Sequence, residues 1–114
     1  MNPGDILLLR FPFTALDTDR KRPSLLLHAT RLTEKIQLVT IAMVTSKVDG
    51  LKLEGDVLIE DWKDAGLLHP SLIRLAKLAT VERDLVEKKL GKVSDGDLLL
   101  IKKSFQKLYK FWSR

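Results

Sequence analysis

The sequence of 114 residues predicts a mainly β domain that ends in one amphipathic helix. Six short apolar runs, separated by Gly, Pro and Asp, fill the stretch from about residue 4 to about residue 93. This punctuation is typical of a compact antiparallel sheet or a small barrel. From about residue 95 to about residue 112, apolar side chains recur at helical spacing. The length suits one domain with its own core, so we treat residues 1–114 as a single unit.

The six expected strands follow one another at short intervals. Some of their apolar stretches, such as 7–9 and 25–27, are continuous rather than alternating, which is typical of strands covered on both faces. Asp49 and Gly50 form a tight-turn signal after the third run. The runs are Ile6–Phe11, Ser24–Ala29, Ile36–Thr45, Asp56–Ile59, Leu72–Val81 and Leu85–Val93.

The C-terminal segment predicts a helix that begins after Ser94. Asp97 follows Ser94 by three residues, an arrangement typical of a helix N-cap, and acidic side chains suit the positive end of the helix dipole. Apolar residues then follow at spacings of 3, 4, 3 and 4, and we expect this stripe to pack inward while the lysines face outward. The stripe consists of Leu98, Ile101, Phe105, Leu108 and Trp112.

The excess positive charge lies at the C-terminal end of the chain. The 20 basic and 15 acidic residues give a net charge of +5. Residues 102–114 contain five Lys or Arg and no acidic residue, so positions 1–101 are neutral overall. The net charge therefore does not identify a ligand for the β-rich body.

The composition excludes several kinds of site. The chain has no cysteine, which rules out disulfides, thiolate zinc sites and a cysteine nucleophile. Two histidines are too few for a multi-histidine metal centre, and we expect no metal and no cofactor. No apolar run approaches the roughly 18 residues of a membrane span, and the first residues do not resemble a signal peptide. We therefore expect a cytoplasmic protein that does not contact a membrane.

Four segments, taken in order, resemble the PemK/MazF family of toxins, which are sequence-selective endoribonucleases of type II toxin–antitoxin systems. Each motif is short, but their order and spacing cover almost the whole chain. The segments are Gly4–Leu9 with Phe11–Thr14, then Lys21–Ser24, then Met43–Ser46, and finally Gly66–Leu67, Pro70–Arg74, Leu78–Val81 and Leu90–Ser94.

The resemblance implies a small SH3-like β-barrel with a C-terminal helix, usually assembled as a homodimer. It implies metal-independent cleavage of single-stranded RNA, mRNA in the cell, and neutralisation by a cognate antitoxin. Antitoxins of this family are typically acidic and partly disordered. The C-terminal lysines would attract RNA at long range or an acidic antitoxin segment.

Arg22 and Thr45 are the first two candidate catalytic residues. A guanidinium at a strand entry can bind a phosphate through two parallel hydrogen bonds, although Arg22 can also pair with Asp17 or Asp19. A hydroxyl at a strand end can bind a phosphate or a ribose 2′-OH, although Thr45 can also simply end its strand. The resemblance assigns the catalytic arginine to Arg22 and the second catalytic group to Thr45. The neighbours expected to position the RNA backbone are Lys21, Ser46 and Lys47.

Arg74 is the third candidate catalytic residue. One branch of the family uses an arginine here together with an aspartate two residues later and a histidine in the turn before the Lys21–Ser24 motif. This chain has Ala76 and no histidine at 17–21, so that triad is not available. Arg74 either stabilises charge or is an ordinary strand residue. We expect catalysis to rely on positioning and electrostatics.

Three aromatic or imidazole side chains have two interpretations each. Trp62 either stacks on an RNA base or seals its loop against the barrel. His28 lies in an expected strand, where a structural role is favoured over a base. His69 precedes Pro70 in a turn from which it can reach a site, but the resemblance gives it no role.

Two rival functions remain open at this point. A related class of barrel toxin, of the CcdB type, poisons DNA gyrase through its C-terminal helix and does not cleave RNA. Trp112, near the end of this chain, is the residue that favours this alternative. The other alternative is a degenerate family member that binds RNA or a partner without cleavage, which Ala76 and the missing turn histidine favour.

Overall fold

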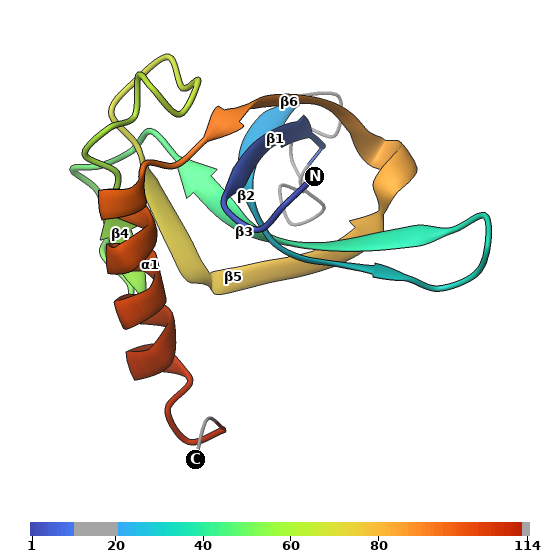
Figure 1. Cartoon of the computed structure of the whole chain (residues 1–114). Coiled ribbons are helices and arrows are strands. Elements are labelled where there is room, and N and C mark those ends of the chain that lie inside the picture. The colour runs from blue at the N-terminus through green and yellow to red at the C-terminus, as the bar shows by residue number, and fades with distance from the viewer. Residues whose placement is uncertain (11–20, 113–114) are drawn as a thin grey trace.

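The computed structural model describes residues 1–10 and 21–112 (Figure 1). The motif residues Phe11–Thr14 and the acidic pair Asp17 and Asp19 lie outside the described residues. A 3-10 turn, η1 (Arg83–Leu85), separates the last two strands. The other elements are β1 (Asp5–Leu9), β2 (Arg22–Arg31), β3 (Gln37–Thr45), β4 (Asp56–Leu58), β5 (Leu72–Glu82), β6 (Val86–Lys92) and the helix α1 (Asp95–Leu108). Each of the six expected strands is therefore confirmed, with small differences at the ends.

The strands form one antiparallel sheet in the order β4-β5-β3-β2-β1-β6. The chain turns at η1 and returns as β6 to pair with β1, so the sheet curls around into a barrel-like shape (Figure 1). Within the described residues, β4 and β6 are edge strands and do not pair with each other, so the curled sheet stays open. The expected mainly β architecture with a C-terminal helix is confirmed.

The sheet buries apolar side chains on both of its faces. One cluster includes Ile6 and Leu25 and receives Ile101 from α1. The other includes Leu7 and Leu26. Because adjacent residues of a strand point to opposite faces, this division explains why the apolar stretches at 7–9 and 25–27 are continuous rather than alternating.

The start of α1 is tied to the connection between β4 and β5. The Ser94 hydroxyl accepts a hydrogen bond from the Asp97 N–H (3.2 Å), so the expected N-cap is confirmed. The Asp97 carboxylate is buried and points away from the cap. It accepts hydrogen bonds from the backbone N–H groups of Glu60 (3.0 Å) and Asp61 (2.9 Å). One side chain therefore links the first helical turn to the loop.

Replacing Asp97 with Asn is expected to destabilise the fold by about 1–3 kcal/mol, because one of two buried charge-assisted hydrogen bonds is lost. The side-chain NH2 group of Asn, itself a donor, would also face a backbone N–H donor. Chemical unfolding in urea measures the effect. Asp95→Asn is the matched control, since Asp95 is exposed in the same helical turn. Equal stability of the two variants would contradict this role of Asp97.

The end of α1 differs from the expectation. The helix ends at Leu108 rather than at Trp112, and Trp112 is 81% exposed, so the prediction that it packs inward is wrong. Tyr109 occupies the C-cap, and its hydroxyl donates a hydrogen bond to the Leu75 carbonyl of β5 (2.7 Å). Beyond this anchor, Phe111 and Trp112 contact each other edge to face (ring centroids 5.1 Å apart). Leu98, Ile101 and Leu108 pack on the core as expected, whereas Phe105 is 39% exposed, so its expected inward packing is wrong as well.

In the part of the chain that the structure describes, no helix has the length and apolar character needed to cross a membrane.

Candidate functional site

Arg22 and Thr45 lie at the same end of neighbouring strands. Arg22 begins β2, Thr45 ends β3, and the two strands are antiparallel. Ser24 pairs with Met43, and continuing this register by two residues brings Arg22 opposite Thr45. Two motifs that are 23 positions apart in the sequence thus meet at one end of the paired strands β2 and β3.

A cavity of about 470 Å³ opens at this end of the strands. The cavity is formed by strand ends, by the β4–β5 connection and by β6. Its apolar walls consist of Leu8, Pro23, Val44, Leu67 and Leu90. No acidic side chain occurs among the described lining residues. The polar side chains that line the cavity are Lys21, Arg22, Thr45, Ser46, His69, Ser71 and Lys88. This combination of cations and hydroxyls suits an anionic ligand.

The Thr45 side chain is oriented by the backbone that follows it. Its Oγ1 accepts a hydrogen bond from the Lys47 N–H at 3.1 Å. A hydroxyl that accepts in this way still has its own proton to donate. Thr45 is half-buried, so the hydroxyl is held at the cavity with a donor available for an anionic oxygen.

Arg22 is half-buried, and its guanidinium is not fully used by the protein. Its Nε is buried and has no hydrogen-bond partner within residues 1–10 and 21–112. The alternative pairing with Asp17 or Asp19 falls on residues outside the described part of the chain. A buried donor without a partner is costly. Arg22 also lines the cavity, where its guanidinium can meet an anionic ligand.

Lys21 is held at the rim of the cavity by Glu87 of β6. Its Nζ donates a hydrogen bond to the Glu87 carboxylate, and both side chains are partly exposed. This hydrogen bond, with the positive charges of Lys21 and Lys88, lowers the pKa of Glu87. The carboxylate therefore stays ionised and competes with any phosphate for Lys21.

Three of the expected site residues do not line this cavity. Arg74 forms an ion pair with Asp56 (Nε to Oδ1, 3.5 Å), and its guanidinium donates a hydrogen bond to the Leu51 carbonyl, so it ties β5 to β4 and to the loop before β4. Trp62 is half-buried and packs against the apolar cluster that includes Ile101. Lys47 is exposed and contributes its backbone N–H to Thr45 instead.

The connection between β4 and β5, residues 59–71, is fixed over the cavity. The Ile59 N–H donates to the Ser71 carbonyl (3.0 Å), which closes the base of the loop. Gly66 has φ +85°, and a Cβ at this position would lie 2.2 Å from the Leu90 carbonyl oxygen of β6. A Cβ at Gly91 would lie 2.5 Å from the Ala65 carbonyl oxygen. The two backbones approach so closely that only glycine fits on either side.

No three His, Asp or Glu side chains gather as metal ligands would in the part of the chain that the structure describes.

The family model described as "PemK-like, MazF-like toxin of type II toxin-antitoxin system" matches residues 2–109. The chain belongs to this family.

Two solved structures are similar to this MazF-like toxin. The Mycobacterium tuberculosis toxin MazF-mt6 has 20% sequence identity and a TM-score of 0.69, with 96% of this chain and 97% of that chain covered. An endoribonuclease in complex with its cognate antitoxin, from a mycobacterial species, has 13% identity and a TM-score of 0.67, with 94% and 92% covered. At these identities the similarity concerns the fold, and the expected barrel-like fold is confirmed. Among the curated proteins, none matches the chain.

Sequence patterns did not select two of the residues that line the cavity in this MazF-like chain. Lys88 reaches it because it pairs with Leu8, 80 positions earlier, and no local pattern encodes this pairing. Ser71 lies within a family motif, but nothing in its spacing indicates that the loop folds back over β2 and β3.

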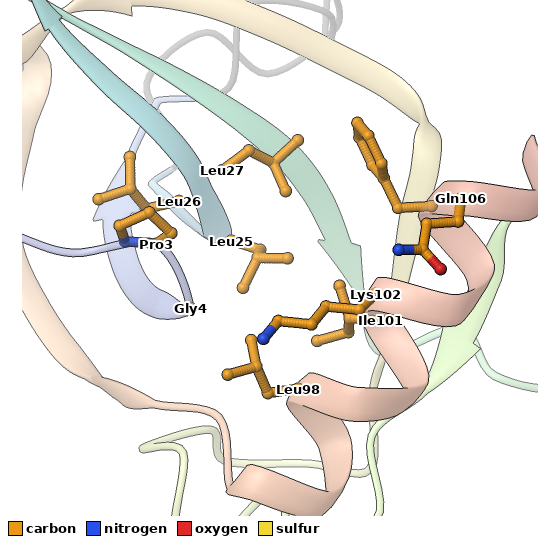
Figure 2. A pocket seen from close by; sticks show the side chains of 10 residues that line it. Pro3, Gly4, Leu25, Leu26, Leu27, Leu98, Ile101, Lys102 and Gln106 are labelled. Carbon is orange, nitrogen blue, oxygen red and sulfur yellow. The ribbon is translucent and has the colours of Figure 1, made fainter. Parts of the chain in front are cut away.

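A second cavity, of about 250 Å³, lies between β2 and α1 of the toxin (Figure 2). Leu25 on β2 faces Leu98 and Ile101 on α1, and Lys102 is the cation among its lining residues. With its mostly apolar walls, this cavity does not provide the set of donors that a phosphate requires.

Proposed function

We propose that this chain is an endoribonuclease toxin that cleaves single-stranded RNA in a sequence-selective way and without a metal ion. The observation that carries the proposal is that Arg22 and Thr45, the two positions that match the family's catalytic motifs, line one cavity together. Membership of the toxin family supports it, and so does the absence of acidic side chains among the described lining residues.

In the proposed reaction, the ribose 2′-oxygen attacks the adjacent phosphorus. Negative charge builds on the phosphoryl oxygens, and stabilising it is the main task of the protein. Arg22 donates hydrogen bonds to these oxygens from the wall of the cavity. Thr45, oriented by the Lys47 N–H, donates a hydrogen bond from its hydroxyl to the same phosphate. Lys21, Ser46 and Lys88 position the flanking RNA backbone.

The proposed partner is a cognate antitoxin with an acidic segment. The mycobacterial endoribonuclease with a similar fold is described in complex with its own antitoxin. An acidic segment would pair with the lysines exposed on α1, such as Lys102 and Lys103. We also propose a homodimer that acts in the cytoplasm, where mRNA is available. Light scattering of the purified chain tests the dimer.

The test of the proposed function is incubation of the purified protein with mixed RNA in excess EDTA. The expected result is a set of discrete fragments, with a rate that EDTA does not change. Fragments that disappear when EDTA is added would contradict metal-independent cleavage. Intact RNA together with inhibited DNA supercoiling by gyrase would instead support a gyrase poison, and intact but bound RNA would support a non-catalytic binder.

A further inference from the structure

We infer that His69 is the proton donor for the leaving 5′-oxygen, an inference that rests on the proposed RNA cleavage. Departure of an alkoxide from phosphorus is slow unless it receives a proton. Arginine and lysine hold their protons too tightly for this task near neutral pH, and threonine is a weak acid. Of the described residues that line the cavity, His69 is the one whose side-chain type exchanges a proton between pH 5 and 8.

The backbone on both sides of His69 is fixed, although the side chain is exposed. The Ser71 hydroxyl donates a hydrogen bond to the His69 carbonyl at 2.8 Å. Pro70 restricts the conformation of the residue before it to the extended region. Earlier in the same loop, Gly66 lies against the Leu90 carbonyl of β6. The backbone therefore holds His69 at the cavity, and within residues 1–10 and 21–112 its imidazole has no hydrogen-bond partner.

His69 supplies a proton carrier that the other described lining residues of the cavity do not provide. No acidic side chain lies among the described lining residues, so no carboxylic acid can supply the proton there. The chain's other histidine, His28, lies on β2, where it pairs with Thr40 of β3, and it does not line the cavity. The β4–β5 loop thus brings an imidazole to the phosphate from a different segment of the chain.

The proposed step balances as follows. The bond between the 2′-oxygen and phosphorus forms as the bond between phosphorus and the 5′-oxygen breaks. The electron pair of the broken bond remains on the 5′-oxygen, which takes a proton from the His69 imidazolium. The proton of the 2′-OH passes to solvent water, and the neutral imidazole regains a proton from solvent. The products are a 2′,3′-cyclic phosphate and a 5′-OH, and nothing else is consumed.

A pair of synthetic RNAs tests this role. One RNA has the natural linkage at the cleavage site, and the other has sulfur in place of the bridging 5′-oxygen. A thiolate leaves without a proton, so the second RNA does not need an acid. His69→Ala is expected to cleave the natural RNA about 10²- to 10³-fold more slowly than the unsubstituted protein. It is expected to cleave the sulfur-linked RNA at close to the unsubstituted rate. His28→Ala, the matched control, should cleave both RNAs normally.

Each other outcome overturns the inference. Equal slowing on both RNAs would mean that His69 binds or positions the substrate rather than donating a proton. An unchanged rate on both would mean that it takes no part. If the unsubstituted protein leaves both RNAs intact, the proposed function itself fails, and the role of His69 fails with it. Thermal unfolding of His69→Ala separates loss of the fold from loss of the proton donor.

Discussion

Replacing Arg22 with Ala is expected to lower the rate of RNA cleavage by about 10²- to 10³-fold, the usual loss when one charge-stabilising donor is removed. The physical reason is the position of the guanidinium at the cavity, where it can donate two hydrogen bonds to a phosphate. Single-turnover cleavage of a defined RNA under saturating protein isolates the chemical step from binding.

Two further substitutions sharpen the Arg22 experiment. Arg22→Lys keeps the positive charge but loses the planar pair of donors, so its rate should fall between those of the original protein and Arg22→Ala. Arg31→Ala removes an exposed arginine from the opposite end of the same strand and should leave the rate unchanged. An Arg22→Ala protein that cleaves at the original rate would refute the assignment of Arg22 to the site.

Gly66→Ala is expected to destabilise the fold by about 2–3 kcal/mol, and therefore to lower the melting temperature by roughly 10 °C. The added Cβ would meet the Leu90 carbonyl oxygen at 2.2 Å, and this neighbour is backbone that cannot move aside like a flexible side chain. The positive φ of +85° adds strain for any residue with a Cβ. Thermal unfolding followed by circular dichroism measures the change.

Gly50→Ala is the matched control for this prediction. A Cβ at Gly50 would lie 3.7 Å from the Lys47 carbonyl oxygen, an ordinary van der Waals contact, so its effect should stay within about 0.5 kcal/mol. If Gly66→Ala and Gly50→Ala melt at the same temperature, the close approach of the loop and β6 is not a determinant of stability.

Much of the fold could be predicted because its signals are local. The continuous apolar stretches and their turn residues located all six strands, and Ser94 located the start of α1. The end of the helix could not be predicted in this way. The hydrogen bond of Tyr109 reaches Leu75, 34 positions earlier. The apolar spacing includes Trp112 as one more residue of the helix, because spacing contains no information about the contact between Tyr109 and Leu75.

The same distinction between local signals and distant contacts applies to the candidate site. Arg22 and Thr45 belong to short motifs at strand ends, so their convergence follows once the two strands pair. The ion pair of Arg74 with Asp56 depends on how β4 adds to the edge of β5, a register that spacing does not reveal. The contribution of Lys88 depends on the most distant pairing in the sheet, that of β1 with β6.

The three attachments of the loop at 59–71 have a consequence for the thermodynamics of the proposed RNA binding. Its base closes on Ser71, its middle lies against Leu90, and its early N–H groups are bound by Asp97 of the helix. Conformational freedom is therefore lost when the chain folds, not when RNA arrives. Since ordering a loop on association reduces affinity, a wall that is rigid beforehand leaves more of the contact energy with RNA available for binding.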